Sequence, residues 1–255
     1  MQDIYYIILF FVFGLVFGSF FNVVSYRIPK GESLIKPSSH CPKCNHKLSF
    51  IDLIPVFSYI FQLGKCRYCH KKIPIFYPIV ELCTGLLFVL SFLMFGLSFQ
   101  TITVLVFVST IEIIILSDIL YMIVPDSILL FSGLTLLLLN IISKGINYIP
   151  TLLLDMIIPF LFMYLLKFVG DKMFKRESLG GGDIKLMVLI GMVLGWELSI
   201  TTIVMAAFLA LPISLISLIK NKNHELPFVP YIGVSAFILL FLKVDINSIL
   251  NLLIY

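Results

Sequence analysis

Long apolar runs, separated by short polar stretches, recur along the whole of this 255-residue chain. The first extends from Ile4 to Val24 without a charged side chain, and a helix that crosses a bilayer needs about 20 mostly apolar residues. Only 13% of all residues are charged, roughly half the share found in a water-soluble domain. The chain lacks the polar groups needed to cover a core in water, so its composition requires a bilayer as solvent.

Apolar segments of this kind predict an all-α polytopic membrane protein with about eight transmembrane helices. They occupy residues 4–26, 77–97, 99–117, 126–143, 148–169, 184–196, 197–219 and 228–243. The first exceeds the apolar core of a signal peptide, and no small-residue cleavage pattern follows it, so it is expected to remain as a span. Residues 246–255 are too few to cross and are expected to lie at the membrane interface.

The basic residues predict which side of the membrane each loop faces. Nine of the eighteen lie between Arg27 and Lys72, and cytoplasmic loops carry an excess of Lys and Arg. If that segment is cytoplasmic, eight spans place sixteen basic residues inside and leave only Lys144 and Lys243 outside. Both termini should then face away from the cytosol. No nucleic-acid motif accompanies the cluster, so it is interpreted as a topology signal and no nucleic-acid partner is expected.

Three parts are expected along the chain: a first transmembrane helix (1–26), a small cytoplasmic insert (27–76) and a transmembrane bundle (77–255). The insert contains two CxxC pairs, separated by 21 residues, which are Cys41, Cys44, Cys66 and Cys69. Four thiolates at this spacing can close a tetrahedral Zn²⁺ site without an open position, so the metal is expected to be structural. Disulfides are disfavoured in the cytosol, and no βαβ pattern supports a redox role.

Two aspartates stand at the ends of predicted spans, both on the side predicted to be cytoplasmic. Asp118 ends the third helix, and Asp183 begins the sixth, directly after three glycines. Ionisable groups at membrane spans are costly and suggest a function. Two converging carboxyl groups that share one proton can hydrolyse a peptide bond through a bound water. We therefore expect an aspartic peptidase dyad, with the glycines leaving room for a substrate backbone and allowing positive φ.

Other roles stay open for the acidic residues. Asp118 and Asp183 could be simple interfacial caps, and Asp126 is expected to be a helix N-cap. Glu112 and Asp155 could tune the site, but the simpler interpretation is that they are paired, buried structural groups. The whole chain could instead be a polytopic transporter, which would favour ionisable residues near the membrane midplane, or an idle scaffold that binds partners through its zinc module.

Six short segments and the cysteine pairs follow one another over nearly the whole length. The segments are Gly18–Pro29, Asp52–Tyr59, Tyr77–Glu81, Ser117–Asp126, Gly180–Leu186 and Leu226–Pro230. In this order they resemble the type IV prepilin peptidases, the bifunctional leader peptidase/N-methyltransferases.

The resemblance implies that Asp118 and Asp183 form the aspartyl dyad. The substrates would be prepilins or pseudopilins, cut after a glycine that precedes a hydrophobic helix, at the cytoplasmic face of a bacterial inner membrane. The resemblance also implies that the insert and neighbouring helices support S-adenosylmethionine-dependent methylation of the new N-terminus. Asn22, Arg27 and Glu81 are the polar candidates there for binding the methyl donor, with helix packing as their alternative role.

The chain departs from the expected family pattern at two positions. Phe76 stands where arginine is expected, and Val229 replaces an expected glycine. Neither position belongs to the dyad, whereas Phe76 lies in the part that the resemblance connects with methylation. The identity of the pilin and the oligomeric state stay open.

Overall fold

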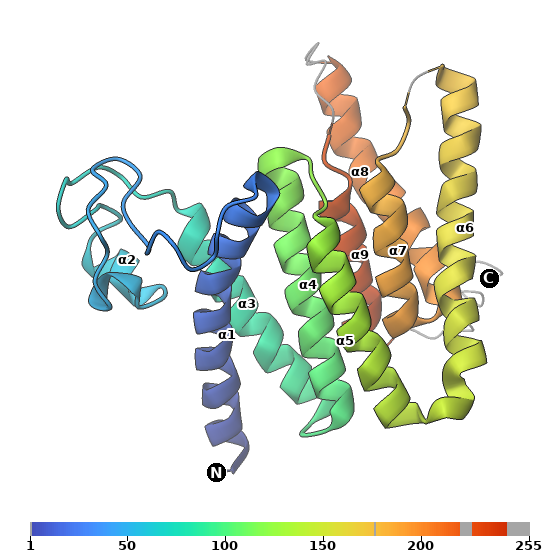
Figure 1. Ribbon diagram of the computed structural model, residues 1–255, viewed down its shortest axis with the longest axis horizontal. Helices are drawn as coiled ribbons and strands as arrows, with labels where there is room; N and C mark the ends of the chain where they lie inside the picture. Colours follow the sequence, from blue (N-terminus) through green and yellow to red (C-terminus); the bar gives the residue numbers. More distant parts are fainter. Residues whose placement is uncertain (1, 176, 220–225, 244–255) are drawn as a thin grey trace. The chain divides into compact units, whose positions relative to one another are not determined.

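The computed structural model describes residues 2–175, 177–219 and 226–243, and these fold mainly into helices (Figure 1). The longer helices are α1 (Gln2–Arg27), α3 (Phe76–Phe95), α4 (Phe99–Tyr121), α5 (Asp126–Lys144), α6 (Ile149–Phe174), α7 (Gly181–Leu194), α8 (Trp196–Ile219) and α9 (Val229–Phe241). The predicted all-α class is confirmed. Each predicted segment coincides with one of these helices, and the bounds differ by a few residues.

Length separates these helices into two groups. Six are long and apolar enough to cross a membrane: α1, α3, α4, α5, α6 and α8. Helix α7 has 14 residues and α9 has 13, so each is about 20 Å long, against about 30 Å for a hydrocarbon core. The described residues support a multi-pass membrane protein, but the predicted count of eight spans is not confirmed. The predicted interfacial segment, 246–255, lies outside the described residues.

Two compact units divide the chain, Met1–Thr101 and Ile102–Tyr255. In the first unit, α1 packs along α3. Small residues permit this approach, because a Cβ added to Gly14 would lie 2.6 Å from the Gly85 Cα atom. Close backbone contact at small residues is typical of helix pairs in membranes. The division groups α3 with α1, whereas the sequence analysis placed residues 77–255 in one bundle.

The insert between α1 and α3 contains little regular structure. Its helical elements are η1 (Ile28–Lys30), η2 (Ile51–Leu53) and α2 (Phe57–Phe61). Helix α2 begins after Val56, whose φ of 61° is strained for a β-branched residue. The Val56 amide donates a hydrogen bond of 2.7 Å to Glu81 Oε2 on α3. A buried carboxylate of the helix pair thus holds the strained turn of the insert.

In the second unit, α7 packs against α5, α6, α8 and α9 (Figure 1). Its side chains of Leu186, Met187 and Ile190 are fully buried. Helix α4 is joined to α5 by a hydrogen bond of 2.8 Å from the Thr110 hydroxyl to the Ser132 hydroxyl. The position of α7 is therefore defined by contacts on several sides.

Asp155 connects three segments of this unit. Its carboxylate on α6 accepts hydrogen bonds from the Tyr148 hydroxyl at 3.0 Å and from the Trp196 amide at 3.1 Å. The second bond attaches the turn between α7 and α8 to α6. The prediction that Asp155 is a paired, buried structural group is confirmed, since its side chain is buried and both oxygens have donors.

Candidate active site and metal centre

The four cysteines of the insert form one cluster. The Sγ atoms of Cys41, Cys44, Cys66 and Cys69 all lie within 4.8 Å of one another, and all five cysteines of the chain are reduced. Four sulfurs held about 2.3 Å from a tetrahedral Zn²⁺ would be about 3.8 Å apart, and Cys41 and Cys69 are already 3.9 Å apart. The cluster can therefore hold a metal ion of this size.

Each cysteine pair lies in a knuckle of the same design. An isolated bridge between His40 and Lys47 closes the first knuckle, and one between Lys65 and Lys72 closes the second. In each, the residue after the second cysteine has a left-handed φ, 55° at Asn45 and 57° at His70. Two similar tight turns thus present their thiols to a common point, as a zinc knuckle requires.

The thiols of the cluster interact electrostatically. Burial alone would raise the pKa of Cys41, but amide donors from Lys43 and Cys44 and neighbouring thiols lower its pKa to about 7. The amide of His46 favours ionisation of Cys44, yet desolvation and the nearby thiols raise the pKa of Cys44 to about 11. This splitting is expected of crowded thiols that can share one bound cation.

Asp52 connects η2 with the second knuckle. Its carboxylate accepts hydrogen bonds from the Ser49 hydroxyl at 2.6 Å, from Gln62 Nε2 at 3.1 Å and from the Tyr68 hydroxyl at 3.3 Å. Desolvation alone would raise the pKa of Asp52, but the bonds from Ser49 and Tyr68 and the charge of Arg67 hold it below its ordinary value. This ionised side chain organises the polar part of the insert.

The three polar candidates for methyl-donor binding are buried and hold backbone groups of their own unit. Arg27 Nη1 donates to the Ser33 carbonyl at 2.9 Å, and Asn22 Nδ2 donates to the Tyr77 carbonyl at 3.3 Å. Glu81 accepts the Val56 amide described above. The contacts of Arg27 and Glu81 fasten the insert to α1 and α3, and the contact of Asn22 joins α1 to α3, so all three have a structural task.

Asp118 lies one turn before the end of α4 and is 6% exposed. Its Oδ2 atom accepts a hydrogen bond of 3.2 Å from the Val229 amide, at the first residue of α9. The preceding residue, Ser117, donates from its hydroxyl to the Ile123 carbonyl at 2.6 Å. The end of α4 is thus tied both to the following loop and to the N-terminus of α9.

Asp183 is the third residue of α7 and is 8% exposed. The Gly180 amide at the N-cap donates a hydrogen bond to its carboxylate, as in a capping box. None of the three preceding glycines has positive φ, so that part of the prediction is wrong. A Cβ on Gly182 would lie 2.5 Å from the Val124 Cβ, whereas one on Gly181 would meet nothing within 4 Å. Gly182 serves close packing, and Gly181 leaves open space.

The carboxyl groups of Asp118 and Asp183 lie close enough to interact electrostatically. They come from different helices, 65 positions apart in the sequence, and both are buried. The structure therefore brings together the two aspartates that the sequence singled out. The negative charge of Asp118 therefore disfavours ionisation of Asp183.

Sequence reasoning missed Lys167 as a member of this site. Its Nζ atom on α6 donates to the Leu179 carbonyl at 2.9 Å and lies 3.4 Å from Glu177 Oε1. Its charge also acts on the Asp183 carboxyl group. Asp171 holds the same loop, by accepting the Ser178 amide at 2.6 Å. No sequence signal distinguishes Lys167 from other lysines near the ends of spans.

Asp126 has a different role from the predicted one. The N-cap of α5 is Pro125, and no side-chain cap is present, so the N-cap prediction is wrong. Asp126 is the first helical residue, and its exposed carboxylate pairs with Lys185 Nζ at 2.7 Å. This ion pair joins α5 to α7 near Asp183. Glu112 is buried in α4, six positions before Asp118.

Comparisons with known proteins agree with the two units. The profile of the bacterial peptidase A24 N-terminal domain matches residues 12–95, and that of the type IV leader peptidase family matches residues 105–215. No solved structure matches the chain.

Several curated relatives are named prepilin leader peptidase/N-methyltransferase. The one from Bacillus subtilis (strain 168) is 33% identical over 229 residues, which cover 89% of this chain and 90% of the relative. The one from Aeromonas salmonicida (strain A449) is 30% identical, and the match covers 92% of this chain and 90% of the relative. The one from Vibrio cholerae serotype O1 is 35% identical, and the match covers 75% of this chain and 79% of the relative. Two domain profiles in the right order and these relatives show that the chain belongs to the type IV leader peptidase family, among the prepilin leader peptidase/N-methyltransferases.

Proposed function

We propose that this protein cleaves the leader peptide of prepilins or pseudopilins and that Asp118 and Asp183 are its catalytic dyad. The observation that carries the proposal is the electrostatic interaction of two buried carboxyl groups from α4 and α7. The names of the relatives support the substrate class.

The arrangement supports hydrolysis by general acid–base catalysis. A water between the two carboxyl groups attacks the scissile carbonyl carbon and loses a proton to the ionised carboxylate. The protonated carboxyl group stabilises the oxyanion that forms. Collapse of this intermediate breaks the C–N bond, and the leaving amine receives a proton. The open space beside Gly181 would admit the extended backbone of the substrate.

The second proposed activity is methylation of the amine that cleavage releases. S-adenosylmethionine would supply the methyl group, and the amine must be deprotonated to attack it. The N-terminal unit matches the N-terminal domain of the family, and we place this activity there. Arg27 and Glu81 would support it by fixing the insert on the helix pair, and Asn22 by joining the two helices. For the four-cysteine site we propose structural Zn²⁺, because four thiolates leave no open coordination position.

Cleavage is proposed to occur at the cytoplasmic face of the bacterial inner membrane, with both chain termini outside. The distribution of basic residues supports this orientation. A transporter is the weaker alternative. Of the deeper acidic residues, Asp155 is occupied by two structural hydrogen bonds, and no ion path is needed to explain it.

The peptidase proposal is tested with purified protein in nanodiscs and a synthetic prepilin. Asp118→Asn and Asp183→Asn should each lower the cleavage rate by ~10²–10⁴-fold, while the exposed Asp126→Asn variant should remain within a few-fold of wild type. Normal cleavage by either dyad variant would refute the assignment. A precleaved peptide with labelled S-adenosylmethionine tests methylation separately, since the dyad variants should still transfer the methyl group.

A further inference from the structure

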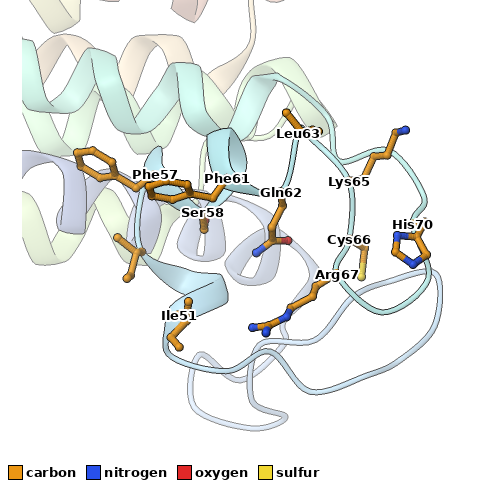
Figure 2. Close-up of a pocket in the computed structure, with 11 residues that line it drawn as sticks. Ile51, Phe57, Ser58, Phe61, Gln62, Leu63, Lys65, Cys66, Arg67 and His70 are labelled. Carbon is orange, nitrogen blue, oxygen red and sulfur yellow. The ribbon is translucent and has the colours of Figure 1, made fainter.

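A groove of about 590 Å³ opens on the insert, beside α2 and the second cysteine knuckle. Figure 2 shows Phe57 and Phe61 along one part of it, with Lys65, Arg67 and His70 along another. One side of the groove is thus apolar and aromatic, and the other is cationic. This combination fits an amphiphile whose polar end is anionic.

The apolar part is unusually exposed for a segment outside the spans. Phe61 is 82% exposed and Leu63 is 85% exposed, and Phe50 nearby in the sequence is 84% exposed. Contact with lipid explains large exposed side chains on the spanning helices. The insert lies between two spans, so exposure there needs another explanation. Contiguous exposed apolar side chains rimmed by polar ones mark an interaction surface.

The charge of the insert points to an anionic partner. Residues 31–75 contain seven Lys and Arg and two acidic residues, which gives +5 with histidines neutral. Four thiolates around one Zn²⁺ contribute −2, so a net charge of +3 remains. Two of the basic residues, Lys65 and Arg67, line the groove itself. Basic residues beside exposed aromatic and aliphatic ones are typical of surfaces that lie on anionic membranes.

The chain itself keeps this surface close to a bilayer. The insert leaves α1 at Arg27 and enters α3 at Phe76, and both helices qualify as spans. The hydrogen bonds from Arg27 and to Glu81 fasten it at two points. Apolar residues are also exposed where the insert enters α3, at Ile75 just before the helix and at Ile79 in its first turn. Large apolar side chains are thus exposed both on the insert and at the start of the span that follows it.

We propose that the groove beside α2 docks on the anionic surface of the membrane in which the protein is anchored. Phe57, Phe61 and Leu63 enter the interfacial layer, and Lys65 and Arg67 contact lipid phosphates. A second copy of the chain would bring the same positive charge to the contact, which disfavours it. This docking is independent of the peptidase chemistry.

The test uses the full-length protein with a single tryptophan as reporter. The chain has one tryptophan, so Trp196→Phe gives a silent background in which Phe61→Trp reports the groove. The protein is reconstituted in phosphatidylcholine nanodiscs with or without phosphatidylglycerol, with brominated acyl chains as quencher. We expect a blue-shifted emission and about threefold stronger quenching in the discs that contain phosphatidylglycerol, and a loss of this difference at high salt.

Two matched variants complete the experiment. Lys47→Trp reports an exposed position of the first knuckle outside the groove, where quenching should be weak in both lipids. Lys65→Gln with Arg67→Gln should remove the effect of phosphatidylglycerol on the Phe61→Trp signal, with metal content measured to show that the knuckles are intact. Equal solvent exposure of both reporters would overturn the proposal. So would a blue shift without quenching by bromolipid, because protein rather than lipid would then cover the groove.

Discussion

The amide of Val229 donates a hydrogen bond of 3.2 Å to Asp118 Oδ2, across 111 positions of the sequence. Val229 is the first residue of α9, so the N-terminal end of that helix lies against one carboxyl group of the proposed dyad. Unsatisfied amides and the helix dipole both favour negative charge at a helix N-terminus. Helix α9 therefore stabilises negative charge on Asp118, and the Gly180 amide and Lys167 do the same for Asp183, so each member of the pair has groups that support its ionised form.

Replacing Val229 by proline should slow cleavage. Proline is tolerated at the first position of a helix but removes the amide that binds Asp118. A hydrogen bond to a charged group is worth about 1.5–3 kcal/mol, so kcat should fall by ~10–100-fold. Val229→Ala keeps the donor and should stay within a few-fold of wild type. Cleavage of the synthetic prepilin measures both, and equal rates for the two variants would show that this amide is not used.

Gly181 and Gly182 make a matched pair, because only one of them is packed. A Cβ on Gly182 would lie 2.5 Å from Val124, and overpacking of this kind costs about 1–3 kcal/mol. Gly182→Ala should therefore lower the thermal unfolding temperature. Gly181→Ala should not, because a Cβ there meets nothing within 4 Å. If the space beside Gly181 receives substrate, this second variant should raise KM without loss of stability.

Lys167 is expected to be a positioning residue for Asp183. It holds the Leu179 carbonyl just before the glycines, and its charge acts on Asp183. Lys167→Gln should lower kcat by about tenfold, since one hydrogen bond to a charged group is lost, and should also shift the pH–rate profile. Lys167→Arg should restore most of the activity. Lys172→Gln removes an exposed lysine from the same helix and serves as control. If Lys167→Gln leaves the pH–rate profile unchanged, Lys167 only stabilises the loop and does not act on Asp183.

Composition and spacing alone predicted much of this fold and site. Apolar runs of spanning length located each of the long helices, because a bilayer permits few other structures for such segments. The CxxC spacing predicted the four-cysteine cluster, since two tight knuckles can converge on one metal. Asp118 and Asp183 stood out because charge is rare in this chain, and the topology put them on one side.

The rest depends on tertiary contacts that leave no local signal. The amide of Val229 meets Asp118 only after α9 has packed, and Lys167 reaches the glycine loop from a helix that precedes it. The three glycines were expected to leave room for substrate and to allow positive φ, but the constraint on Gly182 is the neighbouring Val124. The short length of α7 was visible in the sequence. Eight spans were nevertheless expected, because that number places nearly all basic residues on the cytoplasmic side.

Acid should weaken the insert through Asp52. The pKa of Asp52 is lower in the folded state than its ordinary value of 3.8, so the unfolded chain takes up this proton first as the pH falls. The stabilisation is complete above the ordinary value and is lost as the pH drops through the folded-state pKa. Wild type should therefore lose more stability than Asp52→Asn between about pH 5 and pH 3. Parallel curves for the two proteins in thermal unfolding would contradict this role.

Removal of the metal should unfold the insert while the helices persist. The insert has little regular structure, and its two knuckles meet at the four sulfurs and at one ring contact between His46 and Tyr68, so metal binding supplies folding free energy on the order of 10 kcal/mol. We expect about one equivalent of zinc per chain, lost in Cys66→Ser or with a strong chelator. Proteolysis should then cut within the insert. Cys83→Ser is the matched control, because Cys83 lies on the exposed face of α3 outside the cluster. A native protein that contains no metal and yet resists proteolysis would show that the thiols pack without one.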